Sequence, residues 1–245
     1  MRYRLDELLV RRRMVETRSQ AQLLIKEGKV LTSSGVAQKP GQKLNETAKI
    51  TVSITEKYVS RGGHKIKAAF ENFKVKLKDK IIADVGASTG GFSDYVLQNG
   101  AKKVYAIDVG HGQLADKIKN DKRIINMEGI NIKDLKSLPE KVDIAVVDLS
   151  YISLKLALEN IFNLVRGYGR VICLFKPQFE AGKGIVPKDG VIKNERLRET
   201  ILKNFLEWCM EKKYPRPKVM QSPVIGGDGN VEYLLHFQVN PDSIQ

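Results

Sequence analysis

The chain has 245 residues, of which 42% are hydrophobic, and a formal net charge of +14 at pH 7. This length and apolar content can bury a sizeable core, in one large domain or in one domain with an appendage. No stretch approaches the ~18 apolar residues of a membrane span, and the charged first residues carry no secretion signal, so we expect no integral membrane association. The two cysteines, Cys173 and Cys209, lack paired spacing and predict reduced core thiols in a cytoplasmic protein.

The positive charge is concentrated at one end of the chain. Residues 1–80 carry +11 of the total. A local positive field attracts polyanions, of which RNA, DNA and anionic lipid are the usual targets. The alternative is a lysine-rich, solvated surface of the thermophilic kind. A general bias toward lysine would not confine the excess to one end, so we expect an anionic partner.

Residues 1–55 predict a small α+β domain. The apolar stripe within residues 5–9 predicts one helix, and residues 17–20 have the spacing of a capping box before a second. Gly28 is a typical stop for that second helix. Short apolar runs separated by turn residues over 30–54 then predict a small sheet.

The same segment resembles the S-four-type RNA-binding domain of ribosomal and RNA-modifying proteins. The resemblance rests on Arg4-Leu5-Asp6-Glu7-Leu8-Leu9, on the helix start at Thr17 and on Gly28-Lys29-Val30. In that family a basic helix pair lies on structured RNA, which implies phosphate and sugar contacts that position the protein without reading sequence. The alternative is a helix pair whose charges are only solvated. The residues to which the resemblance assigns RNA contacts are Arg4, Arg11, Arg12, Arg13, Arg18, Lys26 and Lys29.

Residues 56–60 predict a linker, and residues 61–245 predict a second domain of the α/β class. From Ile81 onward short β-rich runs alternate with helical stretches, the clearest of which is the helix over 197–210. Alternation of this kind is typical of a mostly parallel sheet with helices on both faces. The expected strands are 81–85, 103–107, 124–127, 144–147, 171–175, 218–221 and 233–239.

A glycine-rich segment, residues 84–92, follows the first of these strands and leads into a helix. Glycines let the backbone approach a ligand closely, and the helix N-terminus offers unpaired amides. The segment has neither the G-x-G-x-x-G of a dinucleotide site nor the Lys-Ser/Thr pair of a P-loop. It looks instead like an S-adenosyl-L-methionine pocket. The predicted cofactor-binding residues are Asp84, Gly86, Ala87, Ser88, Thr89, Gly90, Gly91, Phe92, Asp108 and Val109.

Four charged residues at predicted strand ends, Asp84, Asp108, Asp148 and Lys176, should line one crevice, because ligands of open α/β sheets sit beyond the carboxyl ends of the strands. Asp108 is placed to accept both ribose hydroxyls of the cofactor, and the alternative is an exposed turn aspartate before Gly110. For Asp84 we expect indirect cofactor contact through water or amides, and the alternative is a helix-capping acid.

Two further segments, residues 60–65 and 227–232, are candidates to complete the crevice, since burial is costly for a lone charge. They add Lys65 and Glu232 to Asp148 and Lys176, which makes a Lys-Asp-Lys-Glu cluster. Each member has a simpler alternative. Lys65 and Glu232 would be surface charges, and Asp148 with Lys176 would be a structural ion pair.

The order of these motifs resembles the TlyA (hemolysin A) family, which is similar to the FtsJ-type ribose methyltransferases. The segments that carry the resemblance are 58–63, 84–92, 108–110, 148–150, 176–180 and 229–233. It implies a Rossmann-like class I methyltransferase domain that uses S-adenosyl-L-methionine to methylate the 2′-oxygen of cytidines in ribosomal RNA or ribosomal subunits. By motif position, the family's catalytic tetrad falls on Lys65, Asp148, Lys176 and Glu232.

Within that tetrad we expect Lys176 to be the base, with Lys65 and the sulfonium charge favouring its neutral form and the two carboxylates orienting the lysines and the ribose. The three histidines have no metal-ligand spacing, so no metal is expected. Two other functions stay open at this point: a membrane-active hemolysin, and a non-catalytic RNA-binding or assembly factor. The oligomeric state also stays open.

Overall fold

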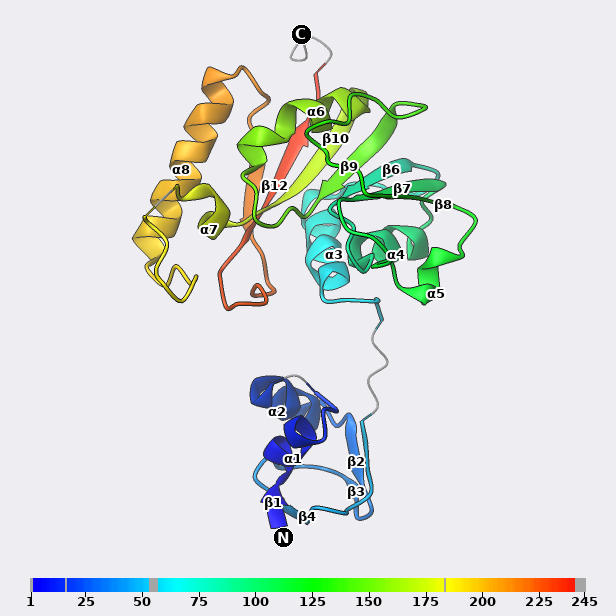
Figure 1. Cartoon of the computed structure of the whole chain (residues 1–245), viewed down its shortest axis with the longest axis vertical. Coiled ribbons are helices and arrows are strands. Elements are labelled where there is room, and N and C mark those ends of the chain that lie inside the picture. Colours follow the sequence, from blue (N-terminus) through cyan, green and yellow to red (C-terminus); the bar gives the residue numbers. More distant parts are fainter. Residues whose placement is uncertain (1, 16, 53–56, 183, 241–245) are drawn as a thin grey trace. The chain divides into compact units, whose positions relative to one another are not determined.

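The structure is a computed structural model that describes residues 2–15, 17–52, 57–182 and 184–240. Contacts between Cα atoms divide the chain into two compact units, Met1–Lys57 and Tyr58–Gln245. The division falls inside the predicted linker, of which Glu56 lies outside the described residues. We describe each unit by itself (Figure 1).

The N-terminal unit is a pair of short helices with small antiparallel sheets, as the α+β prediction requires. Helix α1 spans Leu5–Arg11 and α2 spans Arg18–Lys26, and the side chain of Thr17 caps α2 by accepting a hydrogen bond from the Gln20 amide at 3.2 Å. Strand β1 (Arg2–Arg4) pairs with β4 (Lys43–Asn45). The second sheet has the order β3-β2-β5, from β2 (Val30–Thr32), β3 (Gly35–Val36) and β5 (Ile50–Val52).

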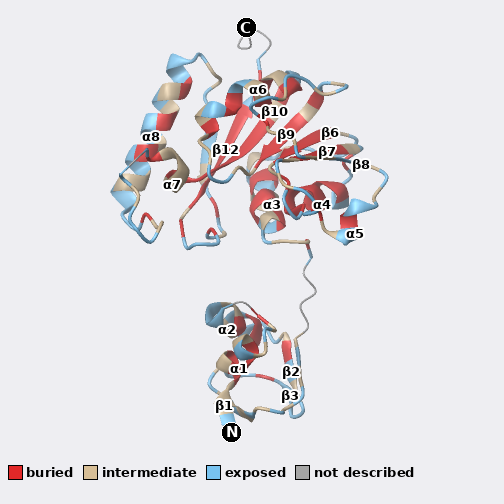
Figure 2. Ribbon diagram, viewed as in Figure 1, coloured by how far each residue is buried: buried red, intermediate tan, exposed pale blue. Residues whose placement is uncertain are grey.

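One small core holds this unit together. The predicted stripe is buried as expected, with Leu5, Leu8 and Leu9 fully inside. Leu5 and Leu9 pack with Ile25 of α2 and Val30 of β2 in a single apolar cluster. Figure 2 shows these buried segments in red on the sides of α1 and α2 that face the sheet. The core therefore holds the cationic residues of both helices at the surface of a rigid support.

The C-terminal unit is built on a seven-stranded sheet of order β11-β12-β10-β9-β6-β7-β8. The five strands from β10 to β8 in this order run parallel. At the other edge β12 runs antiparallel to β10, and β11 pairs antiparallel with β12. This confirms the mostly parallel sheet. The strands are β6 (Ile81–Val85), β7 (Lys103–Asp108), β8 (Ile124–Glu128), β9 (Val142–Val147), β10 (Val165–Phe175), β11 (Lys218–Gln221) and β12 (Tyr233–Gln238).

Helices cover both faces of this sheet, and the strands explain why. Successive residues of β6 alternate between two apolar clusters: Ala83 and Val85 belong to one, whereas Ile82 belongs to the other. The first cluster includes residues of α6 and α8, and the second includes residues of α3 and α4 (Figures 1 and 2). The helices are α3 (Gly62–Phe73), α4 (Gly91–Gln98), α5 (Asp116–Lys119), η1 (Leu154–Leu156, a 3-10 turn), α6 (Leu158–Leu164), α7 (Pro177–Glu180) and α8 (Glu195–Glu211).

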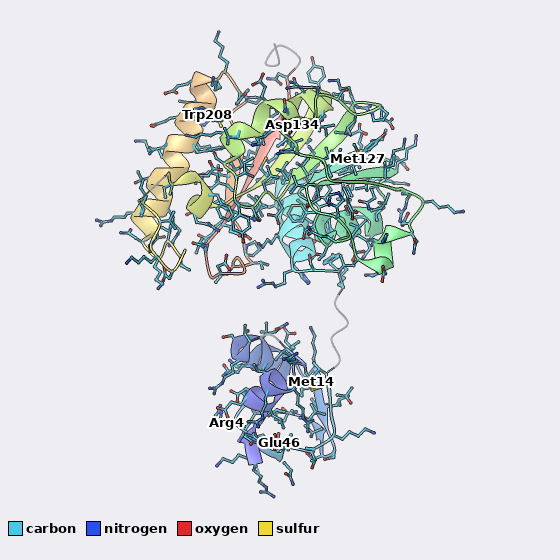
Figure 3. All side chains as sticks on the ribbon, viewed as in Figure 1. Arg4, Met14, Glu46, Met127, Asp134 and Trp208 are labelled. Carbon is cyan, nitrogen blue, oxygen red and sulfur yellow. The ribbon has the colours of Figure 1, made fainter. Side chains whose placement is uncertain are left out.

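Helix α8 is held against the sheet by aromatic rings. Trp208, labelled in Figure 3, lies 5.8 Å from the ring of Phe205 and 5.6 Å from that of Tyr214. Phe205 in turn meets Phe175 at the end of β10, with ring centroids 5.0 Å apart.

Across the described residues, no helix has both the length and the apolar character needed to cross a bilayer.

Candidate active site

The glycine-rich loop connects β6 to α4, and two of its glycines are required by close packing. A Cβ atom at Gly86, whose φ is 81°, would lie 2.3 Å from the carbonyl oxygen of Asp148. A Cβ atom at Gly91 would lie 2.1 Å from the hydroxyl oxygen of Ser60. The loop is therefore pressed between the end of β9 and the segment before α3, where no side chain fits.

Asp84 lies near the end of β6 and is 1% exposed. Its Oδ2 accepts hydrogen bonds from the amide of Ser93 at 2.9 Å and from the hydroxyl of Ser93 at 2.7 Å, so Asp84 ties the strand to the first turn of α4. Its Oδ1 has no hydrogen-bond partner among the described residues. Burial, opposed by the two Ser93 bonds, raises the pKa of Asp84 to about 7. One oxygen has the structural role that we gave as the alternative, and the other stays available as an acceptor.

Asp108 ends β7 and links two loops at the same edge of the sheet. Its Oδ2 accepts the amide of Ser88 at 2.8 Å, and its Oδ1 accepts the amide of Gly110 at 2.7 Å. The turn contact that we gave as the alternative is therefore present. Each carboxylate oxygen keeps a further lone pair for a hydroxyl donor. The next residue, Val109, is 64% exposed and presents an apolar side chain beside this carboxylate.

The four predicted tetrad residues form two close ion pairs. Lys65 Nζ lies 2.5 Å from Glu232 Oε2, and Lys176 Nζ lies 2.6 Å from Asp148 Oδ1. Lys176 also donates to the hydroxyl of Ser150 at 2.8 Å. Both lysines are 8% exposed and Glu232 is 3% exposed. The alternative that Lys65 and Glu232 are surface charges is therefore wrong.

The two ion pairs also act on each other. Burial raises the pKa of Glu232, and the positive charges of Lys65 and Lys176 oppose that shift, while the negative charge of Asp148 adds to it. Two lysines and two carboxylates thus share one poorly hydrated region. Each charge is compensated, which is the condition for keeping charges buried at acceptable cost.

A cavity of about 200 Å³ joins the loop to the tetrad. Lys65 and Asp148 line it, together with Ser60, Arg61 and Gly62 of the segment that leads into α3. Of the predicted cofactor residues, those that line the cavity are Gly86, Ala87, Ser88, Thr89, Gly91 and Phe92. Gly90 instead forms the left-handed N-cap of α4, with φ 88°.

Sequence reasoning missed several residues that the fold places at the site. Ser150 and Ser93 bind Lys176 and Asp84 directly, and Ser60 closes against Gly91. Ser150 lies in segment 148–150, directly after β9, but its position in the sequence does not indicate that Lys176 is its partner. Asp84 lies near the end of β6 and Ser93 lies in the first turn of the helix that follows, α4. A hydroxyl residue in that first turn is the signal in the sequence that could have identified the partner of Asp84.

In the N-terminal unit, most of the predicted RNA-contacting residues already have partners within the protein. Arg4 and Arg18 both bind the buried carboxylate of Asp6, at 3.0 and 3.3 Å. Although burial acts in the opposite direction, the hydrogen bonds from Arg4, Gln22 and Arg18 hold the pKa of Asp6 well below its usual range. Arg4 is labelled in Figure 3.

The remaining cations of this unit differ in how they are held. Arg11 pairs with Glu46 at 3.2 Å, and Lys29 pairs with Glu27 at 2.7 Å. Arg12 donates to the backbone carbonyls of residues 46 and 48. Arg13 and Lys26 have no carboxylate partner among the described residues. Exposed ion pairs are weak, so the paired cations can exchange a carboxylate for a phosphate.

Comparisons with known proteins agree with this geometry. The model of the FtsJ-like methyltransferase family matches residues 58–239, and that of the S4 domain matches residues 4–50. The 16S/23S rRNA (cytidine-2′-O)-methyltransferase TlyA of Mycobacterium tuberculosis is 38% identical over 245 residues, covering 98% of this chain and 91% of the relative. Hemolysin A of Brachyspira hyodysenteriae is 40% identical over 237 residues, covering 96% and 99%.

A solved structure gives the same result for the fold. A chain from Streptococcus thermophilus that is assigned to the hemolysins is 34% identical, has a TM-score of 0.75, and covers 98% of this chain and 89% of its own. The match therefore extends over both units. The chain belongs to the TlyA family of FtsJ-like methyltransferases, with an S4 domain before the methyltransferase domain.

Proposed function

We propose that this methyltransferase uses S-adenosyl-L-methionine to methylate the 2′-oxygen of a ribose, that of a cytidine, in ribosomal RNA. The observation that carries the proposal is that a cofactor-type glycine loop lines one cavity together with Lys65 of one Lys–carboxylate pair and Asp148 of the other. The relatives whose names state rRNA (cytidine-2′-O)-methyl transfer support the choice of substrate. The S4 domain supports RNA as the molecule that is bound.

The residues around the loop fit the cofactor. Gly86 and Gly91 line the cavity with backbone alone, because no side chain fits between them and Asp148 or Ser60. The unpaired Oδ1 of Asp84 accepts an ammonium or a water that binds one, and the free lone pairs of Asp108 accept ribose hydroxyls. The exposed side chain of Val109 offers an apolar contact for adenine. When bound, S-adenosyl-L-methionine supplies a methyl group on a positively charged sulfur.

Lys176 is the proposed base. A ribose 2′-hydroxyl is a poor nucleophile, and a neutral Lys176 amine would accept its proton, while the bound donor would supply the methyl group and keep the electron pair of the broken carbon–sulfur bond as a neutral thioether. Asp148, at 2.6 Å, and Ser150, at 2.8 Å, hold the Lys176 amine in place. Glu232 holds Lys65, so the two carboxylates position the two lysines.

The test is a labelling assay on ribosomal subunits with S-adenosyl-L-methionine labelled in its methyl group. We expect label at ribose 2′-oxygens of rRNA, and we expect Lys176→Ala to lower the rate about 10²- to 10⁴-fold while cofactor binding persists. Lys203→Gln, which removes an exposed lysine on α8, is the matched control and should label at the wild-type rate. Absence of label in a chain that binds the cofactor would contradict the proposal.

The other candidate functions are separated by the same variant. A membrane-active hemolysin predicts leakage of liposomes that survives Lys176→Ala. A non-catalytic assembly factor predicts that Lys176→Ala fully retains the protein's cellular role. The arrangement favours the enzyme, because neither alternative needs a glycine-rich loop at a cavity that one member of each of two Lys–carboxylate pairs also lines.

A further inference from the structure

The beginning of β10 presents an exposed aromatic side chain between two arginines. The segment reads Arg166-Gly167-Tyr168-Gly169-Arg170, and Tyr168 is 71% exposed. The φ of Tyr168 is 63°, in the left-handed region that bulky residues rarely adopt. Such a conformation is unfavourable and persists only where the surrounding structure enforces it. The fold therefore keeps the exposed Tyr168 in an unfavourable backbone conformation.

The turn around Tyr168 is built by close packing. The pairing of β10 with β9 shifts register between Val165 and Arg170, so the intervening residues form a bulge. The Tyr168 amide donates to the carbonyl of Val239 at 2.9 Å, and the Val239 amide donates to the carbonyl of Gly169 at 3.0 Å. A Cβ atom at Gly169 would lie 2.3 Å from Val165 Cγ1. These contacts fix the backbone of the turn that carries Tyr168.

Cations lie on one side of this turn, around Asp143 at the start of β9. Arg166 lies 3.4 Å from Asp143, and Lys80 lies 3.6 Å from the same carboxylate. Lys141 donates to the backbone carbonyl of Asn163. Asp143 is therefore shared by two cations, and the third is held only by a neutral group.

More cations lie on the other side. Arg170 donates to the side-chain oxygen of Gln238, again a neutral partner. Arg170 and Lys218 together act on His236, whose pKa is lowered by burial first and by these two charges second. The described residues that these contacts connect include one carboxylate, Asp143, and five cations. The cations are Lys80, Lys141, Arg166, Arg170 and Lys218. The surface around Tyr168 keeps a surplus of positive charge.

This surface lies at the edge of the sheet opposite the tetrad. β9 begins at Val142 beside the turn and ends at Val147 next to Asp148, so about 20 Å separates the two edges at ~3.3 Å per residue. β12, antiparallel to β10, ends at the same edge (Figure 1). The surface is thus distinct from the cavity that we assign to the cofactor and the target ribose.

We propose that this RNA platform, defined as Tyr168 with Lys80, Lys141, Arg166, Arg170 and Lys218, binds a single-stranded segment of the RNA outside the catalytic site. The proposal rests on the proposed function, which makes RNA the substrate. An exposed ring stacks on an unpaired base, and cations on both sides bind the phosphates that flank it. Stacking accepts any base, so the platform anchors the RNA and leaves the choice of nucleotide to the catalytic edge.

The test measures binding of the full-length chain to bacterial ribosomal subunits at several salt concentrations. Tyr168→Ala should weaken binding about tenfold, and Tyr168→Phe, which keeps the ring, should bind within about twofold of wild type. Tyr168→Gly should lose binding equally without losing stability, because glycine adopts φ 63° freely. Free energies at distant sites add, so the contribution of the S4 domain stays constant across these variants.

A matched pair of charge variants tests the phosphate contacts. Arg170→Gln should lower the slope of log Kd against log salt concentration by about 0.7 to 0.9, the effect of one phosphate contact. Lys203→Gln removes an exposed cation on α8 and should leave the slope unchanged. Wild-type affinity of both Tyr168→Ala and Tyr168→Gly would overturn the platform, and so would an equal loss in Tyr168→Phe.

Two further measurements separate this proposal from its neighbours. The labelling assay described above tests the proposed function itself: rRNA that is never labelled contradicts that function, whereas normal labelling with unchanged affinity of Tyr168→Ala contradicts only the platform. Vesicles that contain anionic phosphatidylserine are the membrane control. Loss of vesicle binding in Tyr168→Ala with unchanged binding to ribosomal subunits would assign the surface to lipid and overturn the proposal.

Discussion

Lys65 donates to Glu232 across 2.5 Å although 167 positions separate the two residues in the chain. Lys65 comes from the first turn of α3, and Glu232 precedes β12, the strand paired with the edge of β10. The bond therefore connects the beginning and the end of the methyltransferase unit at the point where Lys176 and Asp148 also lie. An arrangement of this kind depends on the completed fold.

Removing one partner of this bond should be costly. In Glu232→Gln the Lys65 ammonium stays buried without a carboxylate, and breaking a buried pair costs about 3–5 kcal/mol, less whatever the amide recovers. We expect lower stability in denaturant titration and at least a hundredfold lower methylation rate. The double variant Lys65→Met with Glu232→Leu should recover stability without activity, since apolar replacement of a whole buried pair is often neutral. Recovery of activity in the double variant would exclude a role for the pair in catalysis.

Gly91→Ala should weaken cofactor binding because the added Cβ would lie 2.1 Å from the hydroxyl oxygen of Ser60. Calorimetric titration with S-adenosyl-L-methionine should show a Kd raised about tenfold or more, as expected for displaced loop geometry. Adding Ser60→Gly should restore part of the affinity, because the Ser60 hydroxyl is the nearest obstacle. Gly86→Ala is the contrasting variant. Its Cβ would meet the backbone carbonyl of Asp148 at 2.3 Å, which no side-chain replacement relieves.

Asp84 should make the protein less stable as the pH rises. Its pKa is about 7 in the folded chain against 3.8 for the ordinary side chain, so the folded state holds a proton that the unfolded state releases. The contribution is fully present below pH 3.8 and is lost as the pH passes about 7. The unfolding free energy of wild type relative to Asp84→Asn should fall over this window, by at most about 1.4 kcal/mol per pH unit. A pH-independent difference would contradict the assignment.

His236 should have the opposite effect. Burial, with the charges of Arg170 and Lys218, lowers its pKa from 6.5 to about 4, and its ring stacks on Phe73 at 5.0 Å. Between pH 6.5 and about 4, His236 is protonated in the unfolded chain but stays neutral in the folded chain. The free energy of unfolding therefore decreases as the pH falls through this range. His236→Leu should remove this acid sensitivity from the unfolding free energy. The imidazole resonances in an NMR titration should shift near pH 4; a midpoint near 6.5 would show that the ring is hydrated.

Much of the fold follows from local patterns. The strands over 81–85 and 218–221 begin and end where apolar and β-branched runs predict, because those runs are bounded by turn residues. β10 differs: it begins at Val165, six residues before the predicted 171. The added residues include two glycines, two arginines and Tyr168, which no strand pattern would select. They join the sheet only because β9 and the end of β12 offer backbone partners.

By itself, the sequence predicted most of the elements and, through a family resemblance, the four residues of the proposed tetrad. The strand, the glycine-rich loop and the helix follow one another directly in the chain, so their order can be predicted from consecutive residues. Each of the four tetrad positions lies in a motif of a few residues. Only the tertiary structure decided the partners: Lys65 with Glu232, Lys176 with Asp148 and Ser150, and Asp84 with Ser93. Local conformation depends on neighbours within a few residues, whereas the partner of a buried charge depends on which strand ends the sheet brings together and on the exclusion of water there.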